Sequence, residues 1–240
     1  MTLAEIAALL GLNLALILAA MGALWALSLR SGRIGFLDGV WPLLIAGLAA
    51  TSFIAAQGDP VRKGLLLWLV AIWAAPQAWR RLSPRAGAEA DARYAAVSED
   101  RIVRTGWSRG RVRLITFFLP QGALAWVASL PVQLGQVEFL PPVGWVGWTG
   151  AVLAVAGIGL EGVGSLRRHP TEMSMPAVSG WRRWLRRPDY LGDLAVWWGL
   201  FLIAAETTPG QASVIGPIFL TFALAHWAKT ENPRRVSDGG

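Results

Sequence analysis

The chain has 240 residues, of which 54% are hydrophobic and only 15% are charged, and its mean hydropathy is +0.46. A typical soluble domain carries about 25% charged residues, so this composition excludes an ordinary soluble protein and indicates one domain whose solvent is lipid. The net charge of +7 does not indicate a nucleic-acid binder, because the arginines lie in short groups between apolar stretches, and the absence of cysteine excludes disulfides, iron–sulfur clusters and thiol nucleophiles.

Seven apolar segments follow one another along the chain. A helix needs about 20 residues to cross a bilayer, and only a helix satisfies its own backbone hydrogen bonds in lipid. The predicted spans are 4–29, 36–56, 64–79, 114–134, 143–166, 190–205 and 213–228. Because Glu5 comes early and the first basic residue is Arg30, we interpret the first span as a retained helix rather than a cleaved signal peptide. The sequence therefore predicts an all-α polytopic membrane bundle over residues 1–229 and a disordered tail, 230–240.

The distribution of Lys and Arg over the loops predicts the orientation of this bundle. With seven spans, 20 of the 22 basic residues fall on one side, and only Arg62 and Lys63 fall on the other. Basic loops face the cytoplasm. We therefore expect the N-terminus outside, the C-terminus in the cytoplasm, and a multi-pass protein of the bacterial cytoplasmic (inner) membrane.

Two of the basic loops are long. The loop 80–113 mixes alanines, arginines and acids, and predicts a short surface helix around Arg93 and Tyr94. The loop 167–189 holds tryptophans and arginines, namely Trp181, Arg182, Arg183, Trp184, Arg186 and Arg187. It is explained equally well as an interfacial segment that meets anionic lipid and as a set of arginines that binds phosphate groups.

Ionisable residues inside spans are costly and therefore indicate function. Asp38, Glu161 and Asp193 all fall in the predicted cytoplasmic half, where they can converge on one cavity open to the cytoplasm. Asp189 and Asp193 have a structural explanation too, because negative charge in a first turn suits the helix dipole. Gln121, beside the helix-kinking Pro120, adds a hydrogen-bonding group at moderate depth.

Two apparent motifs carry little weight. Residues 157–162 match the GxGxxG pattern, but they lie inside a predicted span with no preceding strand, so close helix packing explains these glycines better. His169 and His226 are the two histidines, and neither has neighbouring ligands, so we expect no metal site. No Ser-His-Asp spacing predicts a hydrolase.

Several segments in the right order resemble bacterial membrane proteins related to steroid 5α-reductases, a family long described as a domain of unknown function. They are 38–41, 91–94, 118–121, 129–132, Glu161 and, most specifically, Arg186-Arg187-Pro188-Asp189-Tyr190-Leu191-Gly192-Asp193 followed by 196–200. The last segment is similar to the family pattern Arg-His-Pro-Asn-Tyr-Phe-Gly-Glu, with Arg187, Asp189 and Asp193 in place of His, Asn and Glu.

The resemblance implies an NADPH-dependent reductase of a carbon–carbon double bond conjugated to a carbonyl, in a steroid-like or isoprenoid substrate. It implies catalytic roles for Asp38 and Glu161, with Asp38 as a protonated acid that polarises the carbonyl. The residues assigned to the cofactor are Arg182, Arg183, Arg186, Arg187, Asp189, Tyr190, Asp193 and Gln121. The expected partners are membrane lipids, a lipid-like small molecule and other membrane proteins, without nucleic acid.

Two alternatives remain at this point. One is a non-catalytic relative that kept the fold and serves as a scaffold or accessory subunit of a membrane complex, since 14 tryptophans and many small residues also suit protein packing. The other is an S-adenosylmethionine-dependent membrane methyltransferase, because methyltransferases that act on isoprenylated cysteine share the Arg-His-Pro-x-Tyr-x-Gly type of segment.

Overall fold

The computed structural model describes residues 1–166 and 188–230, without the side chains of residues 165, 166, 188, 189 and 226–230. Every regular element in these residues is a helix, as the composition predicts. A helix covers most of each of the seven predicted spans. The elements are α1 (Leu3–Ser31), α2 (Leu37–Ala55), α3 (Pro60–Arg81), α4 (Pro84–Thr105), α5 (Arg109–Arg113), the π-helix η1 (Leu114–Phe118), α6 (Leu119–Ala128), α7 (Leu130–Leu134), α8 (Trp145–Leu166), α10 (Pro188–Ala204), α11 (Thr208–Ala212) and α12 (Ile215–Thr230).

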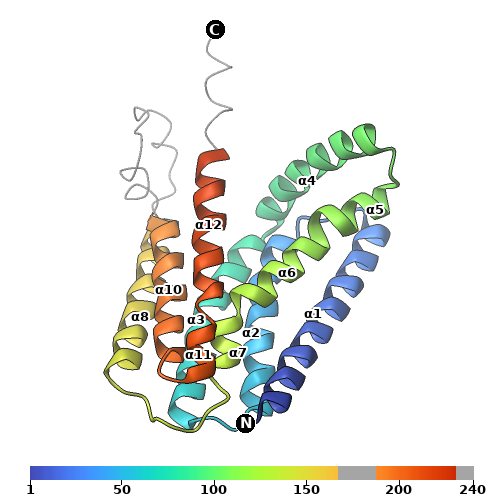
Figure 1. The fold of residues 1–240 in the computed structure, drawn as a ribbon. Coiled ribbons are helices and arrows are strands. Elements are labelled where there is room, and N and C mark those ends of the chain that lie inside the picture. The colour runs from blue at the N-terminus through green and yellow to red at the C-terminus, as the bar shows by residue number, and fades with distance from the viewer. Residues whose placement is uncertain (167–187, 231–240) are drawn as a thin grey trace.

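The surface helix predicted in the loop 80–113 is present as α4. It begins because the Ser83 side chain accepts a hydrogen bond from the backbone N–H of Ala86. It ends at Gly106, whose φ of +67° is a conformation that glycine adopts without strain. Figure 1 shows α4 running obliquely at one end of the bundle, beside α5.

The fourth predicted span is divided into η1, α6 and α7. Pro120 has no N–H to donate to the preceding turn, and the five residues before Leu119 form a π-helix. Ser129 and Pro131 separate α6 from α7. The Trp41 indole of α2 donates to the carbonyl of Gln121 (3.2 Å), so a neighbouring helix supplies a hydrogen bond inside the irregular segment.

Helices α8 and α10 pack closely side by side (Figure 1) because glycines lie between them. A Cβ atom on Gly150 would come within 2.5 Å of the carbonyl oxygen of Gly199, and one on Gly157 within 2.7 Å of that of Gly192. Such backbone contacts are typical of membrane helices. Packing therefore explains Gly157 of the apparent GxGxxG motif, as expected, whereas a Cβ on Gly159 would meet open space.

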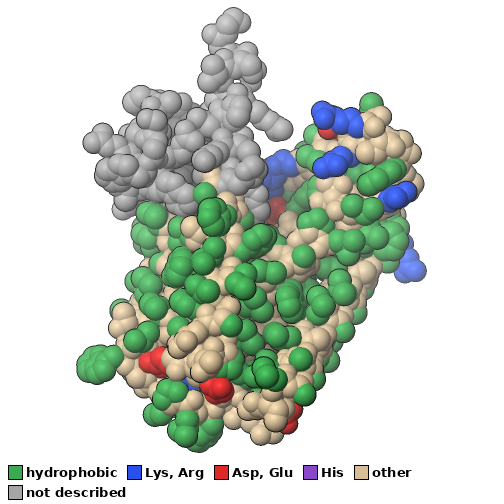
Figure 2. Space-filling model, in the orientation of Figure 1, with side chains coloured by type: hydrophobic (Ala, Val, Ile, Leu, Met, Phe, Trp, Pro, Cys, Tyr) green, Lys and Arg blue, Asp and Glu red, His purple; other side chains and the backbone are tan. Residues whose placement is uncertain are grey.

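The outer surface of the bundle is apolar. Hydrophobic side chains cover the face shown in Figure 2, and large ones such as Trp68, Trp79, Val152 and Phe222 are at least 65% exposed. A soluble monomer does not expose so much contiguous apolar surface. The core beneath it is also apolar and is built on Ile17, Leu37, Leu66, Phe118 and Trp197.

Four segments are long and apolar enough to cross a membrane, which indicates a membrane protein. They are Leu3–Ser31, Leu37–Ala55, Trp145–Gly164 and Thr208–Ala225, and Tyr190–Ala204 is a shorter apolar helix. The other two predicted spans do not reach this standard, since α3 carries basic residues at both ends and η1, α6 and α7 are short pieces. The number of seven spans stays a prediction.

The charges are distributed unevenly along the bundle. Lys and Arg side chains gather over α4 and α5 (Figure 2), at the end of the bundle where α12 finishes, whereas α1 begins at the opposite end (Figure 1). We call the first the basic end. This arrangement fits an odd number of crossings, and the orientation relative to the cytoplasm stays a prediction.

At the opposite end, Arg62 of α3 is fully buried and joins three segments. Its guanidinium donates to the carbonyl oxygens of Glu138 (3.1 Å) and Pro141 and lies 3.8 Å from the Glu206 carboxylate. Glu206 in turn accepts from the backbone N–H groups of Gly144 and Gly147, next to the first turn of α8. This cluster is a structural connection between loops.

A second buried polar group lies among the helices themselves. The Asn13 amide of α1 donates to the Ser52 hydroxyl of α2 (2.9 Å) and to the Gln133 side-chain oxygen of α7 (3.0 Å). Gln133 then donates to the Ser129 hydroxyl (2.8 Å). Because these side chains are completely buried, the hydrogen bonds fix the short helix α7 against α1 and α2.

Candidate active site

The loop between α1 and α2 rests on α4 through a single carboxylate. One oxygen of Asp91 accepts from the backbone N–H groups of Ile34 (2.6 Å) and Gly35 (2.5 Å), and the other accepts from Arg33 (3.1 Å). Burial raises the pKa of Asp91, but these hydrogen bonds outweigh burial and hold the pKa below its usual value. A Cβ atom on Gly35 would lie only 2.1 Å from the carbonyl oxygen of Gly87, so glycine is required for this contact.

This contact positions α4 beside the first turn of α2, where Asp38 lies. Arg93 donates to one oxygen of Asp38 (2.8 Å), and the Tyr94 hydroxyl donates to the other. The Asp38 side chain is 23% exposed. Both oxygens therefore accept a hydrogen bond from α4, and the catalytic role of Asp38 stays a prediction.

The Tyr94 phenol is the most protected ionisable group of this cluster. Its ring packs edge-on against Phe117 (centroids 4.8 Å apart). Burial and then the negative charge of Asp38 raise the pKa of Tyr94 well above its usual value, although the positive charge of Arg93 acts in the other direction. Gln121, assigned to the cofactor from the sequence, lies in α6, where its backbone carbonyl accepts from Trp41.

Three tryptophans connect this cluster to α10. Trp41 and Trp73 pack edge to face with centroids 6.4 Å apart, and Trp73 packs in the same way on Trp197 at 5.3 Å. The Trp73 indole donates to Asp193 (3.0 Å). Tyr190 is half-buried against the same core. A chain of aromatic contacts therefore runs from Trp41, one turn after Asp38 in α2, to Trp197 in α10.

Glu161, near the end of α8, is 6% exposed and pairs with Arg80 of α3 (3.3 Å). Arg80 also donates to the Gln77 side-chain oxygen (3.2 Å). The amide nitrogen of Gln77 is buried and has no hydrogen-bond partner among the described residues. It is a donor that a bound molecule can use.

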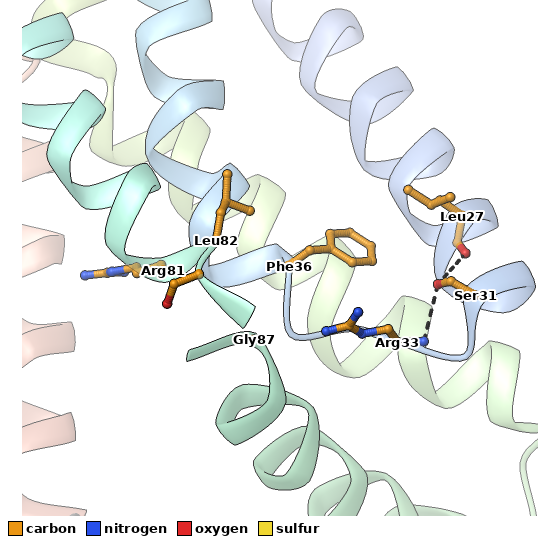
Figure 3. A pocket seen from close by; sticks show the side chains of 8 residues that line it. Leu27, Ser31, Arg33, Phe36, Arg81, Leu82 and Gly87 are labelled. Atoms are coloured by element: carbon orange, nitrogen blue, oxygen red, sulfur yellow. Dashed lines mark hydrogen bonds between the residues drawn. The ribbon is translucent and has the colours of Figure 1, made fainter. Parts of the chain in front are cut away.

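The three predicted carboxylates therefore lie in helices whose nearby ends meet at the basic end of the bundle, and each has a partner. Two hollows that the structure shows lie elsewhere. One, of about 270 Å³, lies between the end of α1 and the junction of α3 with α4, and Phe36 and Arg33 are among the side chains that line it (Figure 3). The other, of about 390 Å³, lies between α4 and α5. Neither is lined by Asp38, Glu161 or Asp193, so one cavity shared by these carboxylates stays a prediction.

Half of the expected cofactor residues cannot be placed. Arg182, Arg183, Arg186 and Arg187 lie outside the described residues, as do His169, the side chains of Asp189 and His226, and residues 231–240 of the tail predicted to be disordered, whose first residue, Thr230, ends α12. Among the residues that the structure describes, no group of histidine, aspartate and glutamate side chains has the arrangement of a metal site.

Comparison with known proteins identifies the family. A family model described as "Protein of unknown function (DUF1295)" matches residues 24–235. The chain belongs to this family. DUF1295 is steroid 5α-reductase-like, in agreement with the resemblance seen in the sequence. No curated protein and no solved structure matches the chain.

The match to DUF1295 spans every element of the cluster described above, from α2 to α12. Within it, sequence reasoning missed Arg93, Tyr94, Arg80 and Trp73 as site residues. Arg93 and Tyr94 belong to a segment that carries the resemblance, and Tyr94 is one of only two tyrosines in the chain. That rarity was the available indication of a role. No such indication existed for Arg80 and Trp73, because arginine at the end of a span and tryptophan near it are common in membrane proteins of any function.

Proposed function

We propose that this protein is a membrane-embedded NAD(P)H-dependent reductase of a conjugated enone in a lipid-like substrate. The observation that carries the proposal is the Tyr94 phenol, which donates to Asp38 beside the apolar core of a lipid-facing bundle. A neutral phenol in such surroundings is a strong hydrogen-bond donor to an oxygen that gains negative charge. The family match adds support at the level of the family alone.

The described residues fit a nicotinamide cofactor in one respect. The buried Gln77 amide nitrogen needs an acceptor, and Arg80 beside it is a cation that is 37% exposed. Phosphate groups need further cations, and the residues that we assign to them are the arginines of the loop 167–187. When bound, the cofactor supplies the hydride that reduces the double bond.

The chain's own residues then act on the carbonyl of the substrate. Tyr94 turns its hydroxyl from Asp38 to the carbonyl oxygen and stabilises the negative charge that develops there during reduction. Asp38 orients the phenol, and Arg93 offsets the charge of Asp38. The β carbon receives the hydride, and the α carbon of the resulting enolate takes a proton from water, so the enone becomes a saturated ketone. In this proposal Tyr94, rather than Asp38, is the donor.

Binding and turnover of purified protein in nanodiscs test the proposal. In separate titrations, NADPH should quench tryptophan fluorescence and S-adenosylmethionine should not. We expect quenching because Trp73 lies beside Asp193, one of the residues assigned to the cofactor. Asp38→Asn should lower the rate of reduction of a steroid or isoprenoid enone while it leaves NADPH binding intact. Asp100→Asn, which changes an exposed partner of Arg104, is the matched control and should behave as wild type.

The second candidate function is a non-catalytic scaffold. It is favoured by the fact that Asp38 and Glu161 already have arginine partners, as structural ion pairs do. A protein that binds neither NADPH nor S-adenosylmethionine in these titrations would be assigned to this role. Quenching by S-adenosylmethionine alone would instead indicate a methyltransferase.

A further inference from the structure

The hollow between α4, α5 and the α1–α2 loop has no place in the proposed reaction. It measures about 390 Å³ and is lined by three arginines, Arg33 from the α1–α2 loop and Arg109 and Arg113 from α5. The carboxylates on its wall are those of Asp91 and Glu99. Asp91 already accepts hydrogen bonds from Arg33 and from two backbone N–H groups. The two positive charges of Arg109 and Arg113 therefore exceed the single negative charge of Glu99 on this wall.

Arg113 is a buried cation at the floor of this region. Only 7% of it is exposed, its guanidinium donates to the carbonyl oxygens of Ser28 and Gly32 (2.7 Å to the latter), and its Nε atom has no partner in the described part of the chain. Burial, and then repulsion by Arg109, lower the pKa of Arg113. Two guanidinium groups close together favour an anion between or beside them.

The hollow lies next to the bilayer surface. The Trp25 indole, in the last third of the long apolar helix α1, donates to the carbonyl of Gly110 in α5 (3.0 Å). A Cβ atom on Gly110 would contact Leu29 at 3.5 Å. Since α1 is long enough to cross the membrane, α5 lies level with the end of a span, at the depth of lipid headgroups.

We propose that this hollow binds the phosphate-bearing headgroup of an anionic phospholipid, with Arg109 and Arg113 as the cations that recognise it. Basic pockets beside membrane spans at the positively charged end of a protein are suited to such headgroups. The acyl chains follow the apolar surface of α1, where Leu27 is 50% exposed. This inference concerns a different surface from the proposed active site and does not depend on enzymatic activity.

Native mass spectrometry of the protein in detergent, titrated with phosphatidylglycerol or phosphatidylcholine, tests the proposal. We expect phosphatidylglycerol to be retained and phosphatidylcholine to be lost. Arg109→Gln should weaken retention about fivefold, the effect of one basic group near an anionic surface. Ala95→Phe, at an exposed position on the wall, should block the hollow without a change of charge.

Arg104→Gln is the matched control, because Arg104 is 74% exposed, pairs with Asp100 and lies close to Arg109 in sequence. It should keep wild-type binding. Equal retention of the two lipids would overturn the proposal. So would equal losses in Arg104→Gln and Arg109→Gln, which would indicate general surface charge, or full binding by Ala95→Phe.

Discussion

The two ends of the bundle use the same chemistry in different ways. At the end opposite the basic end, the Arg62 side chain is fully buried and the Glu206 side chain is 10% exposed, and both are held mainly by backbone groups. At the basic end, the side chains of Arg93 and Arg80 are 69% and 37% exposed, and their carboxylate partners border an aromatic core. An arginine–carboxylate pair that water or a ligand can reach is able to exchange partners, whereas a sealed one holds the fold together.

The largest effect should follow from breaking the sealed pair. Arg62→Met leaves Glu206 and two carbonyl oxygens without their cation, and loss of one partner of a buried pair costs about 3–5 kcal/mol. The unfolding temperature measured in detergent should therefore fall sharply. Arg93→Gln, whose arginine is mostly exposed, should cost at most about 1 kcal/mol. Similar losses in the two variants would remove the contrast between the ends.

At the basic end, a substitution should lower enzymatic activity and leave the stability of the fold nearly unchanged. Tyr94→Phe removes the donor to the substrate carbonyl, and loss of one such donor lowers turnover by about 10²–10³-fold. The unfolding temperature should change little, because the ring still packs on Phe117. Enone reduction and unfolding are measured on the same preparation. An active Tyr94→Phe protein would show that the phenol is not the donor.

A smaller effect is expected for the polar network within the helices. Asn13→Ala leaves the Gln133 side-chain oxygen buried without its donor, which costs about 1–3 kcal/mol. Chemical unfolding should detect this loss, and NADPH binding by the folded fraction should be unchanged. Loss of NADPH binding at full stability would place part of the site at this depth and contradict the division between the ends.

The smallest effect is a dependence on alkaline pH. The pKa of Tyr94 is raised in the folded protein, so the folded state keeps a proton that the unfolded chain loses near pH 10. The stability from this neutral phenol is complete below about pH 10 and is lost as the pH rises further. Above about pH 10 the wild type should therefore lose stability relative to Tyr94→Phe, which has no phenol to ionise. Parallel curves across the whole range would contradict a raised pKa.

Hydropathy was sufficient to predict the helices, since lipid leaves the backbone no alternative. It was insufficient for the count of spans, because arginines at the ends of α3 and the prolines of the fourth segment lower their apolar length. Asp38, Glu161 and Asp193 stood out because charge in an apolar segment is costly. The residues that pair with these carboxylates did not stand out in the sequence. The contact between Tyr94 and Asp38, for example, depends on the tertiary contact by which Asp91 holds the α1–α2 loop.

The most direct test of the account follows the hydride. Wild-type protein and Tyr94→Phe in nanodiscs are supplied with NADPH that carries deuterium at the transferable position, together with a steroid or isoprenoid enone. We expect a saturated ketone with one deuterium at the β carbon from wild type and about 10²–10³-fold less of it from Tyr94→Phe. A wild-type protein that binds the enone and NADPH but forms no deuterated ketone would contradict it.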